Sequence, residues 1–355
     1  MKHHLLAFAT LALSGCATLA PASPTLPGPA AIDAEAARAM ASSQVQGLAI
    51  AVIDHGQVAY VHTYGRRNAA GDPLRANTIM YAASLTKVAF TYMVMQLVDE
   101  GVINLDTTID HYLPRPLPEY REAWVEDRYA RYSDLAGDDR WRRLTPRMLL
   151  THSSGFANFG FLEPDGRLRI HFEPGTQYSY SGDGIILVQF VLEQGLHLDV
   201  GREMQRRVFD RFGMTNSSMM WRADFASNLA DGWALDGSTQ AHDERSAVRA
   251  AGSLDTTITD FAQFAAAFVR GDGLSSRTRA DIVHAWLPIT VATQFPVLQP
   301  ELPPAQRRVD LAAGLGLLTF EGPQGRAFIK GGHNDVTGNI WVCVEARRRC
   351  AVSVA

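Results

Sequence analysis

Lysine is the charged residue that this chain has least of. Only three of its 33 basic residues are lysines, Lys2, Lys87 and Lys330, and arginine supplies the others. Arginine keeps its proton inside a protein, whereas a buried lysine can lose its proton and act as a base. Two interpretations follow. Either the chain keeps lysine where proton transfer requires it, or the three lysines are survivors of a general preference for arginine.

The chain also lacks an excess of positive charge. Its formal net charge is -4 and its isoelectric point is near 6.3, which gives no electrostatic reason to expect nucleic acid as a partner. The arginine run at 347–349 is interpreted as an exposed turn. A length of 355 residues, with 46% hydrophobic and 20% charged residues, is typical of a globular protein of one large or two modest domains.

Several common catalytic and metal-binding motifs are absent. The sequence has no Gly-x-Ser-x-Gly, no His-Glu-x-x-His and no Cys-x-x-Cys, so a classical α/β-hydrolase or a zinc protein has no support. Gly314-Leu315-Gly316 lacks the third glycine of a dinucleotide-binding loop. His152 is interpreted as a structural residue of a turn rather than as a ligand. We therefore expect neither a metal nor another cofactor.

The N-terminus reads as a targeting segment. Its apolar run, Leu5–Leu13, is too short to span a bilayer as a helix. The tetrad that ends in Cys16 (Leu-Ser-Gly-Cys) resembles the bacterial lipoprotein processing box, which implies a signal peptide over 1–15 and a lipid anchor on Cys16. A plain secretory signal cut near Ala20, giving a soluble periplasmic or secreted protein, is the alternative. Because Ala17 is not acidic, the resemblance implies an outer-membrane protein that faces the periplasm.

Cysteine is as scarce as lysine, with three copies. Export implies an oxidising compartment, and Cys343 and Cys350 flank a predicted hairpin turn. Whether the two face each other depends on the strand register, which the sequence leaves open.

Hydrophobic periodicity predicts strands at both ends of the chain. Residues 47–53 and 57–64 form a predicted hairpin, and 311–320, 326–330, 339–345 and 350–354 read as further strands. Between them the pattern is helical, and the segment from Ser84 to Gly101 is apolar nearly all round, which predicts a buried helix. We expect an α+β fold in which one antiparallel sheet, built from both termini, is flanked by helices and carries an inserted helical subdomain.

The domain expectations follow from this pattern. Residues 16–31 are rich in proline and alanine and suit a semi-rigid tether, and 32–355 form the folded domain. Its α/β part covers about 32–110 and 245–355, and its helical part about 111–244. The polar and aromatic stretch 114–143 is interpreted as a helical insertion or lid rather than as core.

Ser84 and Lys87 lie three residues apart at the start of the buried helix and so share a face. A serine hydroxyl needs a base to become a nucleophile, and lysine can serve only if its pKa falls far below about 10.4. Burial and a second cation both lower it, and Lys330 is the expected second cation. Backbone N–H groups at the helix start could stabilise an oxyanion.

These residues lie in one of five segments that resemble the class C β-lactamase and penicillin-binding-protein-like serine hydrolases. In chain order the segments are Ile79–Lys87, Leu149–Gly155, Pro174–Ser181, Phe212–Thr215 and Ala250–Leu254. The resemblance runs from about Ile32 to the end, is weakest over 114–143, and implies the β-lactamase/transpeptidase-like fold.

The resemblance also implies roles for single residues. Ser84 matches the family's nucleophile, Lys87 its base, and Tyr180 the tyrosine that relays protons; a merely packed aromatic is the alternative for Tyr180. The third motif is matched by Lys330-Gly331-Gly332, which implies substrate binding there, and the adjacent His333 competes for that role.

Two departures from the family pattern bear on the substrate. Gly182 stands where the second motif usually ends in Asn, and Gly331 stands where β-lactamases often carry Thr. Both changes remove groups that would hold a penicillin or a peptide. We therefore expect a carboxylic-ester hydrolase with weak β-lactam or D-peptide activity, whose leaving-group side is shaped by 114–143. A lipoprotein that binds a cell-wall peptide without turnover is the alternative.

The end of the chain differs as well. The resembled family follows the third-motif strand with a C-terminal helix across the sheet, whereas this sequence closes on a predicted strand. We expect an uncovered sheet face with Ile340, Val342 and Val352 exposed, unless the segment 32–40 covers it.

Overall fold

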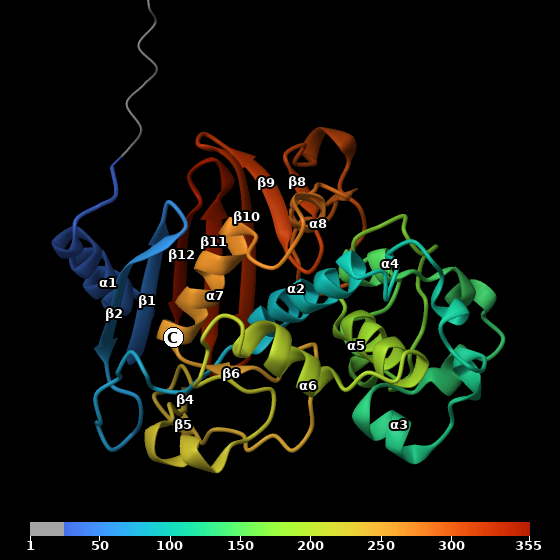
Figure 1. The fold of residues 1–355 in the computed structure, drawn as a ribbon, viewed down its shortest axis with the longest axis horizontal. Coiled ribbons are helices and arrows are strands. Elements are labelled where there is room, and N and C mark those ends of the chain that lie inside the picture. The colour runs from blue at the N-terminus through green and yellow to red at the C-terminus, as the bar shows by residue number, and fades with distance from the viewer. Residues whose placement is uncertain (1–24) are drawn as a thin grey trace, which may run out of the picture.

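The computed structural model describes residues 25–355, so Cys16 and the predicted signal peptide lie outside the described residues. Its centre is an eight-stranded sheet with the strand order β2-β1-β12-β11-β10-β9-β8-β7 (Figure 1). All neighbouring strands are antiparallel. The strands of this sheet are β1 (Gly47–Asp54), β2 (Gln57–Gly65), β7 (Leu287–Pro288), β8 (Leu311–Ala313), β9 (Leu318–Gly322), β10 (Gly325–His333), β11 (Gly338–Val344) and β12 (Arg349–Val354). The expected α+β architecture, with a sheet built from both ends of the chain, is confirmed.

The two ends of the chain meet where β1 pairs with β12, with Ala51 opposite Val352. Val352 also pairs with Trp341 of β11, and both side chains are almost fully buried. Because alternate residues of a strand face opposite sides, Val352 belongs to the covered face, and the expectation that it is exposed was wrong. Ile340 does lie on the other face and is 43% exposed.

Helix α7 (Ile258–Arg270) covers the inner face of the sheet (Figure 1). Thr257 caps its first turn and Gly271 ends it in the left-handed region, so the sequence sets both of its ends. Phe264 and Phe268 make edge or tilted ring contacts with Trp341 of β11. On the opposite side of the hairpin, α1 (Pro29–Ser43) is tied to β2 through Asp33, which accepts hydrogen bonds from Tyr60 and Tyr64. Helix α1 begins inside the stretch interpreted as a tether.

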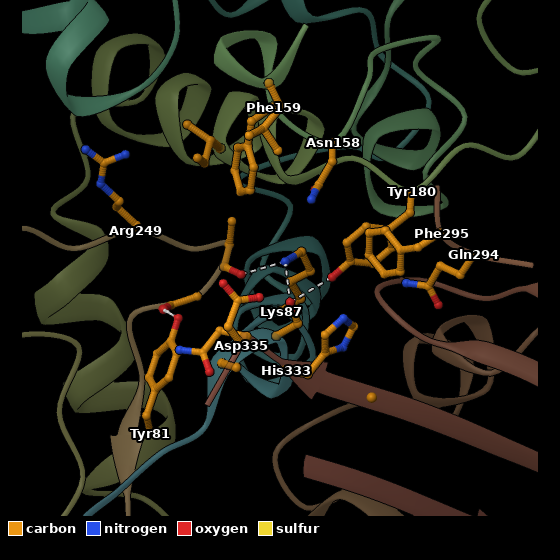
Figure 2. Close-up of a pocket in the computed structure, with 18 of the residues that line it drawn as sticks. Tyr81, Lys87, Asn158, Phe159, Tyr180, Arg249, Gln294, Phe295, His333 and Asp335 are labelled. Carbon is orange, nitrogen blue, oxygen red and sulfur yellow. Dashed lines mark hydrogen bonds between the residues drawn. The ribbon is translucent and has the colours of Figure 1, made fainter. Parts of the chain in front are cut away.

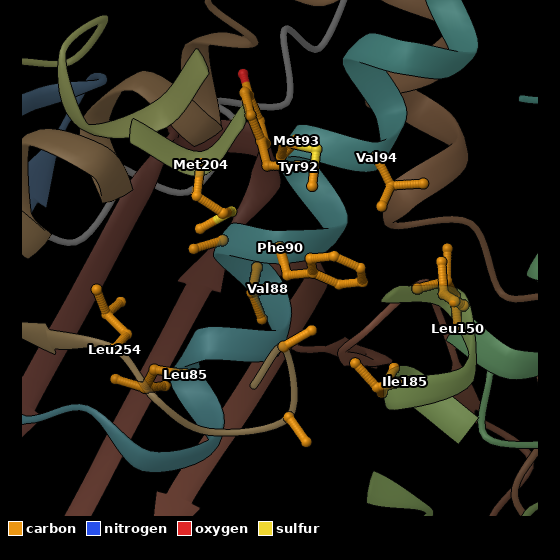
Figure 3. Close-up of a cluster of buried hydrophobic side chains, with 14 of the residues drawn as sticks. Leu85, Val88, Phe90, Tyr92, Met93, Val94, Leu150, Ile185, Met204 and Leu254 are labelled. Carbon is orange, nitrogen blue, oxygen red and sulfur yellow. The ribbon is translucent and has the colours of Figure 1, made fainter. Parts of the chain in front are cut away.

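Helix α2 (Thr86–Asp99) runs from the sheet into the helical part of the molecule. Every residue from Thr86 to Leu97 is buried, as its uniformly apolar sequence predicts. Its side chains meet Leu150, Ile185, Met204 and Leu254 from four other segments (Figure 3). The helix is therefore held on all sides, which fixes the position of its first turn.

The remaining α-helices are short, and 3-10 and π turns connect or extend them. They are α3 (Ala123–Arg128), α4 (Pro146–Leu150), α5 (Gly182–Phe190), α6 (Val200–Met204) and α8 (Ser276–Ile282). Two small ribbons, β3 (Met80–Tyr81) with β6 (Asp255–Thr256) and β4 (Gly232–Trp233) with β5 (Thr239–Gln240), complete the fold. Among residues 25–355, no helix is both long enough and apolar enough to cross a bilayer.

The stretch 114–143 is part of the core. Tyr120, Tyr132 and Trp141 are at most 4% exposed, and Tyr120 and Tyr132 pack on the ring of Phe190 in α5. The interpretation as a lid outside the core was wrong. Several of its charged residues pair with one another or with Glu193 of the neighbouring helical turn, while Tyr120, Tyr132 and Trp141 point inward and Trp124 stays 48% exposed.

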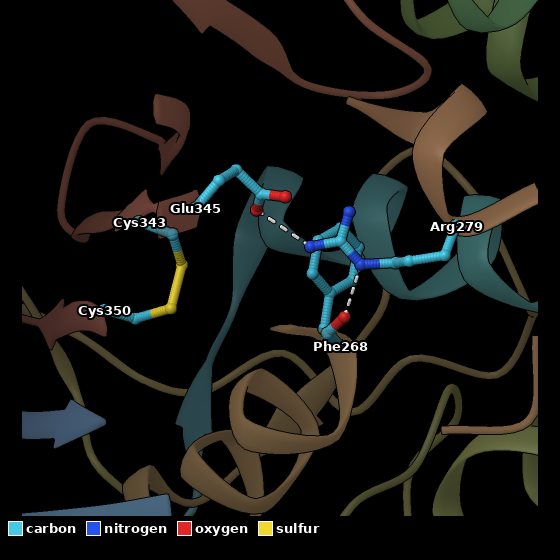
Figure 4. Close-up of a disulfide and its surroundings, with 5 residues drawn as sticks. All are labelled: Phe268, Arg279, Cys343, Glu345 and Cys350. Carbon is cyan, nitrogen blue, oxygen red and sulfur yellow. Dashed lines mark hydrogen bonds and ion pairs between the residues drawn. A yellow bond between two sulfur atoms is a disulfide. The ribbon is translucent and has the colours of Figure 1, made fainter. Parts of the chain in front are cut away.

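Two further details concern the C-terminal strands. The run 311–320 is two strands, β8 and β9, because Gly316 turns the chain at a φ of 72°. Cys343 and Cys350 are directly opposite each other on β11 and β12 and form a disulfide (Figure 4). The register that the sequence left open therefore brings the two sulfurs together.

Candidate active site

Ser84 lies in a single 3-10 turn, Ala83–Leu85, that leads directly into α2. The residue before it, Ala83, has a φ of 47°, a left-handed conformation that costs an alanine of order 1 kcal/mol and is typical of functional sites. Gly332 of β10 packs against this turn so closely that a Cβ there would lie 2.9 Å from the Ser84 nitrogen. The strand and the helix thus fix the turn from both sides.

The hydroxyl of Ser84 is held between two side chains. The Nζ atom of Lys87 lies 2.9 Å from its Oγ atom, and the Tyr180 hydroxyl donates to the same oxygen at 2.8 Å. Lys87 also donates to the carbonyl oxygen of Ala251 at 2.5 Å (Figure 2). The structure therefore brings together the three residues that the sequence proposed as nucleophile, base and proton relay.

Lys87 is a fully buried lysine without a carboxylate partner among residues 25–355. Burial lowers the pKa of Lys87 well below its usual value, and the charge of Lys330 lowers it further. Lys330, on β10, is also buried, and burial lowers its pKa to about 7. Both depressions act in the direction that a lysine base requires, since only the neutral amine can accept the serine proton.

Tyr180 occupies the centre of this group. Burial raises its pKa, so the phenol keeps its proton at neutral pH and donates to Ser84. Lys330 approaches the same hydroxyl, with 3.4 Å between Nζ and the phenolic oxygen. His152 lies beneath the tyrosine ring at 4.4 Å between centroids, and burial lowers the pKa of His152. The histidine is a neutral support for Tyr180, in keeping with a structural role.

These residues open on a cavity of about 580 Å³. One wall is apolar and comes from the loop at 159–162 and from α5; it consists of Phe159, Phe161, Leu162 and Ile186. The other wall is polar and includes Gln294, His333 and Asp335 (Figure 2). The backbone N–H of Ser84 makes no hydrogen bond within residues 25–355, which leaves it available to an oxyanion at the bottom of the cavity.

Lys330 and His333 occupy different places although both belong to β10. Lys330 faces the buried side beside Tyr180, whereas His333 is exposed and lines the cavity. The geometry gives Lys330 the contact with Tyr180, and it leaves His333 facing the cavity.

Several residues that line the cavity were not predicted from the sequence. Asn158, Arg249 and Phe295 face the cavity, and the Phe295 ring lies 5.1 Å from the Tyr180 ring. No residue of 114–143 lines this cavity, so the expectation that this stretch shapes the leaving-group side was wrong. Asn158 and Arg249 could have been suspected because each closely follows or precedes a recognised segment; nothing in the sequence pointed to Phe295.

Metal ligation has no evident place in this arrangement. Within the part of the chain that the structure describes, no three His, Cys, Asp or Glu side chains gather as metal ligands would. The groups around Ser84 are amines, a phenol and backbone amides, which suit acyl transfer to a hydroxyl.

The match to a known family decides the classification. The model of the Beta-lactamase family covers residues 32–354. The chain belongs to this family. Its Ser84 and Lys87 thus stand in the fold that Beta-lactamase family members share, and the β-lactamase-like fold expected from the sequence is confirmed.

Individual proteins of known activity share only about a quarter of their residues with this chain over the matched part. A lovastatin esterase of Penicillium rubens is 26% identical over 221 residues, and the match covers 54% of each chain. A monacolin J acid methylbutanoyltransferase of Aspergillus terreus is 27% identical over 228 residues, covering 55% of this chain and 53% of that one. The chain therefore spans about half the length of the curated relatives it matches.

A solved structure, described as the D-alanine carboxypeptidase AmpC from Burkholderia cenocepacia, superposes with a TM-score of 0.69 at 18% identity. The match covers 91% of this chain and 92% of that one. At this identity the likeness establishes the fold alone.

Proposed function

We propose that this protein is a serine acyl-hydrolase that forms a covalent acyl-enzyme on Ser84, and that carboxylic esters are its substrates. The observation that supports this proposal most strongly is that the Ser84 hydroxyl lies between Lys87, whose lowered pKa favours the neutral amine, and Tyr180, whose raised pKa keeps the phenol protonated. Lys87 is in contact with the Ser84 hydroxyl and can remove its proton. Tyr180 is in contact with the same oxygen and can later give a proton to the leaving group.

The steps follow from these contacts. Neutral Lys87 takes the hydroxyl proton as the Ser84 oxygen attacks the ester carbonyl carbon, and the Ser84 N–H stabilises the resulting oxyanion. As the carbon–oxygen bond to the alcohol breaks, Tyr180 gives that oxygen a proton, and the proton that Lys87 took from Ser84 then replaces it on the phenol. Water then attacks the acyl-enzyme and gives up a proton to Lys87. As the carbon–oxygen bond to Ser84 breaks, Lys87 returns a proton to the Ser84 oxygen, which releases the acid and restores both the serine hydroxyl and the neutral base.

Two features support esters over β-lactams and D-peptides. Gly182 and Gly331 lack the side-chain amide and hydroxyl that would hold an amide and a carboxylate, and the nearby wall is apolar. The similarity to a protein named as an esterase points the same way. We infer that β-lactams and D-alanyl peptides are turned over weakly at most.

A substrate panel tests this proposal. Nitrophenyl esters of short and medium acyl chains, the β-lactam nitrocefin and a D-Ala-D-Ala peptide are compared by kcat/KM, with Ser84→Ala as the blank. We expect the esters to lead by at least about a hundredfold, equivalent to some 2.7 kcal/mol of barrier. Faster peptide or β-lactam turnover would overturn the ester assignment, and stable acylation without turnover would favour a binding role.

We further propose that Cys16 is lipidated and holds the enzyme at a bacterial outer membrane facing the periplasm. The support is the Leu13–Cys16 motif behind a short apolar run. Metabolic labelling with a fatty-acid analogue should mark the wild type and spare Cys16→Ser, which should appear as soluble protein. An unlabelled wild type cut beyond Cys16 would contradict the anchor.

A further inference from the structure

One buried carboxylate near the cavity takes no part in the catalytic steps. Asp183 lies in the first turn of α5, three residues after Tyr180, and is 2% exposed. Among residues 25–355 it has no ion-pair partner, and Arg249 acts on it only through its charge. A carboxylate that gives up its water at such a depth needs hydrogen bonds in exchange, so its contacts indicate its role.

The contacts of Asp183 are with the loop that forms the apolar wall of the cavity. Its Oδ2 atom accepts the backbone N–H of Gly160 at 2.6 Å. Its own backbone N–H donates to the carbonyl oxygen of Asn158 at 3.0 Å. Because a hydrogen bond to an ionised carboxylate is about twice as strong as a neutral one, the bond to Gly160 is the stronger of the two attachments.

Gly160 stands between the two aromatic rings of the wall. The rings of Phe159 and Phe161 are stacked, with 5.1 Å between their centroids and 13° between their planes. The Phe159 ring also rests on Gly182, where an added Cβ atom would lie 2.3 Å from two of the ring carbons. Holding the Gly160 N–H therefore fixes the backbone from which both rings project.

This wall faces the acyl part of an ester. In the proposed steps Tyr180 gives a proton to the departing alcohol, so the alcohol lies on the side of the Tyr180 hydroxyl, where the Phe295 ring also packs. Figure 2 shows Phe159 on another side of Lys87, apart from Tyr180 and Phe295. The acyl chain is left to the apolar wall, and each methylene that a well-placed wall buries adds to binding.

We propose that Asp183 is a positioning residue that holds this wall through Gly160 and thereby sets the preference of the enzyme for long apolar acyl groups. The role rests on the proposed esterase function and specifies which esters that function favours. Asp183 acts through the loop, since it is not among the residues that line the cavity around Ser84. The ionised carboxylate holds the Gly160 N–H more firmly than the neutral acid does.

Protonation of Asp183 should therefore change the preference. Burial raises the pKa of Asp183 to about 7, against the opposing effects of the Gly160 N–H and the Arg249 charge. Asp183 also lines a second cavity, of about 290 Å³. The other charged groups that line this cavity are Glu126, Asp127, Arg131 and Arg249. Tyr132 is a buried phenol whose pKa is raised by burial and further by the charge of Asp183.

The ratio of kcat/KM for two esters tests the role. 4-Nitrophenyl heptanoate and 4-nitrophenyl acetate share a leaving group, and the protonation of Lys87 and the folded fraction of enzyme affect both alike, so the ratio reports acyl selection alone. In the wild type we expect this ratio to fall at least about threefold between pH 8.5 and pH 5.5, as Asp183 takes up a proton. In Asp183→Ala it should lie about tenfold below the wild-type value at pH 8.5 and stay constant with pH.

Two further variants separate this role from general effects. Asp183→Asn keeps an oxygen for the Gly160 N–H but cannot ionise, so it should retain part of the preference and lose its pH dependence. Asp165→Asn removes an exposed acid from the same loop, one that pairs with Arg169. This control should keep both the wild-type ratio and its change with pH.

The outcomes are distinct. A ratio that is equal in the wild type and in Asp183→Ala, or one that does not change with pH in the wild type, overturns the positioning role and leaves the esterase function standing. An equal change in Asp165→Asn also overturns it, because loss of any acid from this loop would then have the same effect. If the wild type hydrolyses neither ester beyond the Ser84→Ala blank, the function and the positioning role both fall.

Discussion

The amine of Lys330 lies 3.4 Å from the hydroxyl of Tyr180, which in turn donates to the Ser84 oxygen. This contact joins strand β10 to the start of α2 through one phenol. Because Lys330 is buried and lowers the pKa of Lys87, a residue outside the Ser-x-x-Lys tetrad helps to set the protonation of the base.

The pH dependence of activity should follow from this relationship. The charge of Lys330 lowers the pKa of Lys87, so Lys330→Met should let that pKa rise. Since Lys87 works when neutral, the acid limb of the kcat/KM profile should then move to higher pH. Ester hydrolysis measured from pH 5 to 10 checks this, and an acid limb that stays in place or moves down would contradict the coupling.

Stability should depend on pH for the same reason. The pKa of Lys330 is about 7 in the folded chain and near 10.5 when exposed, so between these values the unfolded state binds more protons. Folding stability should therefore rise with pH across this window, by up to about 1.4 kcal/mol per pH unit from this residue. Lys330→Met should unfold at higher urea concentration at pH 7 and show a shallower rise toward pH 9.

Arg326 provides the control for that measurement. It is an exposed cation on the same strand, paired with the exposed Glu321. Arg326→Met should leave the slope of stability against pH unchanged. An equal change of slope in both variants would mean that loss of any charge from β10, rather than burial of Lys330, causes the effect.

Lys87→Arg should be nearly inactive. Arginine keeps a positive charge at this place but cannot become the neutral base. We expect kcat/KM for a nitrophenyl ester to fall by at least about a thousandfold, or some 4 kcal/mol of barrier. Circular dichroism should confirm that the variant is folded. Activity within about tenfold of the wild type would exclude Lys87 as the base.

The disulfide should stabilise the chain without serving catalysis. Cys343 and Cys350 pair at one end of β11, while Asn339 and Gly338 mark the end nearer the cavity. Replacing both cysteines with alanine should cost about 2–3 kcal/mol of unfolding free energy, the loop-closure value for a separation of 7 residues. The value of kcat/KM should not change. Alkylation of both thiols in unfolded, non-reduced protein would show that the bond is absent.

The sequence predicted the parts of the fold that have strong local patterns. Helix α2 and the hairpin β1–β2 are apolar segments with clear ends, and both were predicted within a few residues. Helix α7 was missed although Thr257, Gly271 and regularly spaced phenylalanines mark it. The stretch 114–143 was wrongly interpreted as lying outside the core. Its buried aromatic residues are interspersed with surface arginines, so its composition alone did not indicate that one side is buried.

The residues of the candidate site also fall into a group that the sequence predicted and a group that it did not. Ser84, Lys87 and Tyr180 lie in recognisable segments, and the structure brings them into contact. Phe295 could not be predicted as a cavity residue, since its place depends on a loop that crosses the site from a distant part of the chain. The sequence also could not show whether Lys330 or His333 contacts Tyr180. That depends on which face of β10 is turned toward Tyr180, because the two side chains lie on opposite faces of the strand.

The most direct test of the central claim is to locate the acyl group on the protein. A fluorophosphonate probe and a slowly hydrolysed nitrophenyl ester are each incubated with the wild type and with Ser84→Ala, and the digested chains are mapped by mass spectrometry. The account predicts one adduct, on the peptide that contains Ser84, and none in the variant. Hydrolysis of esters by wild type and variant alike, or an adduct on another residue, would contradict it.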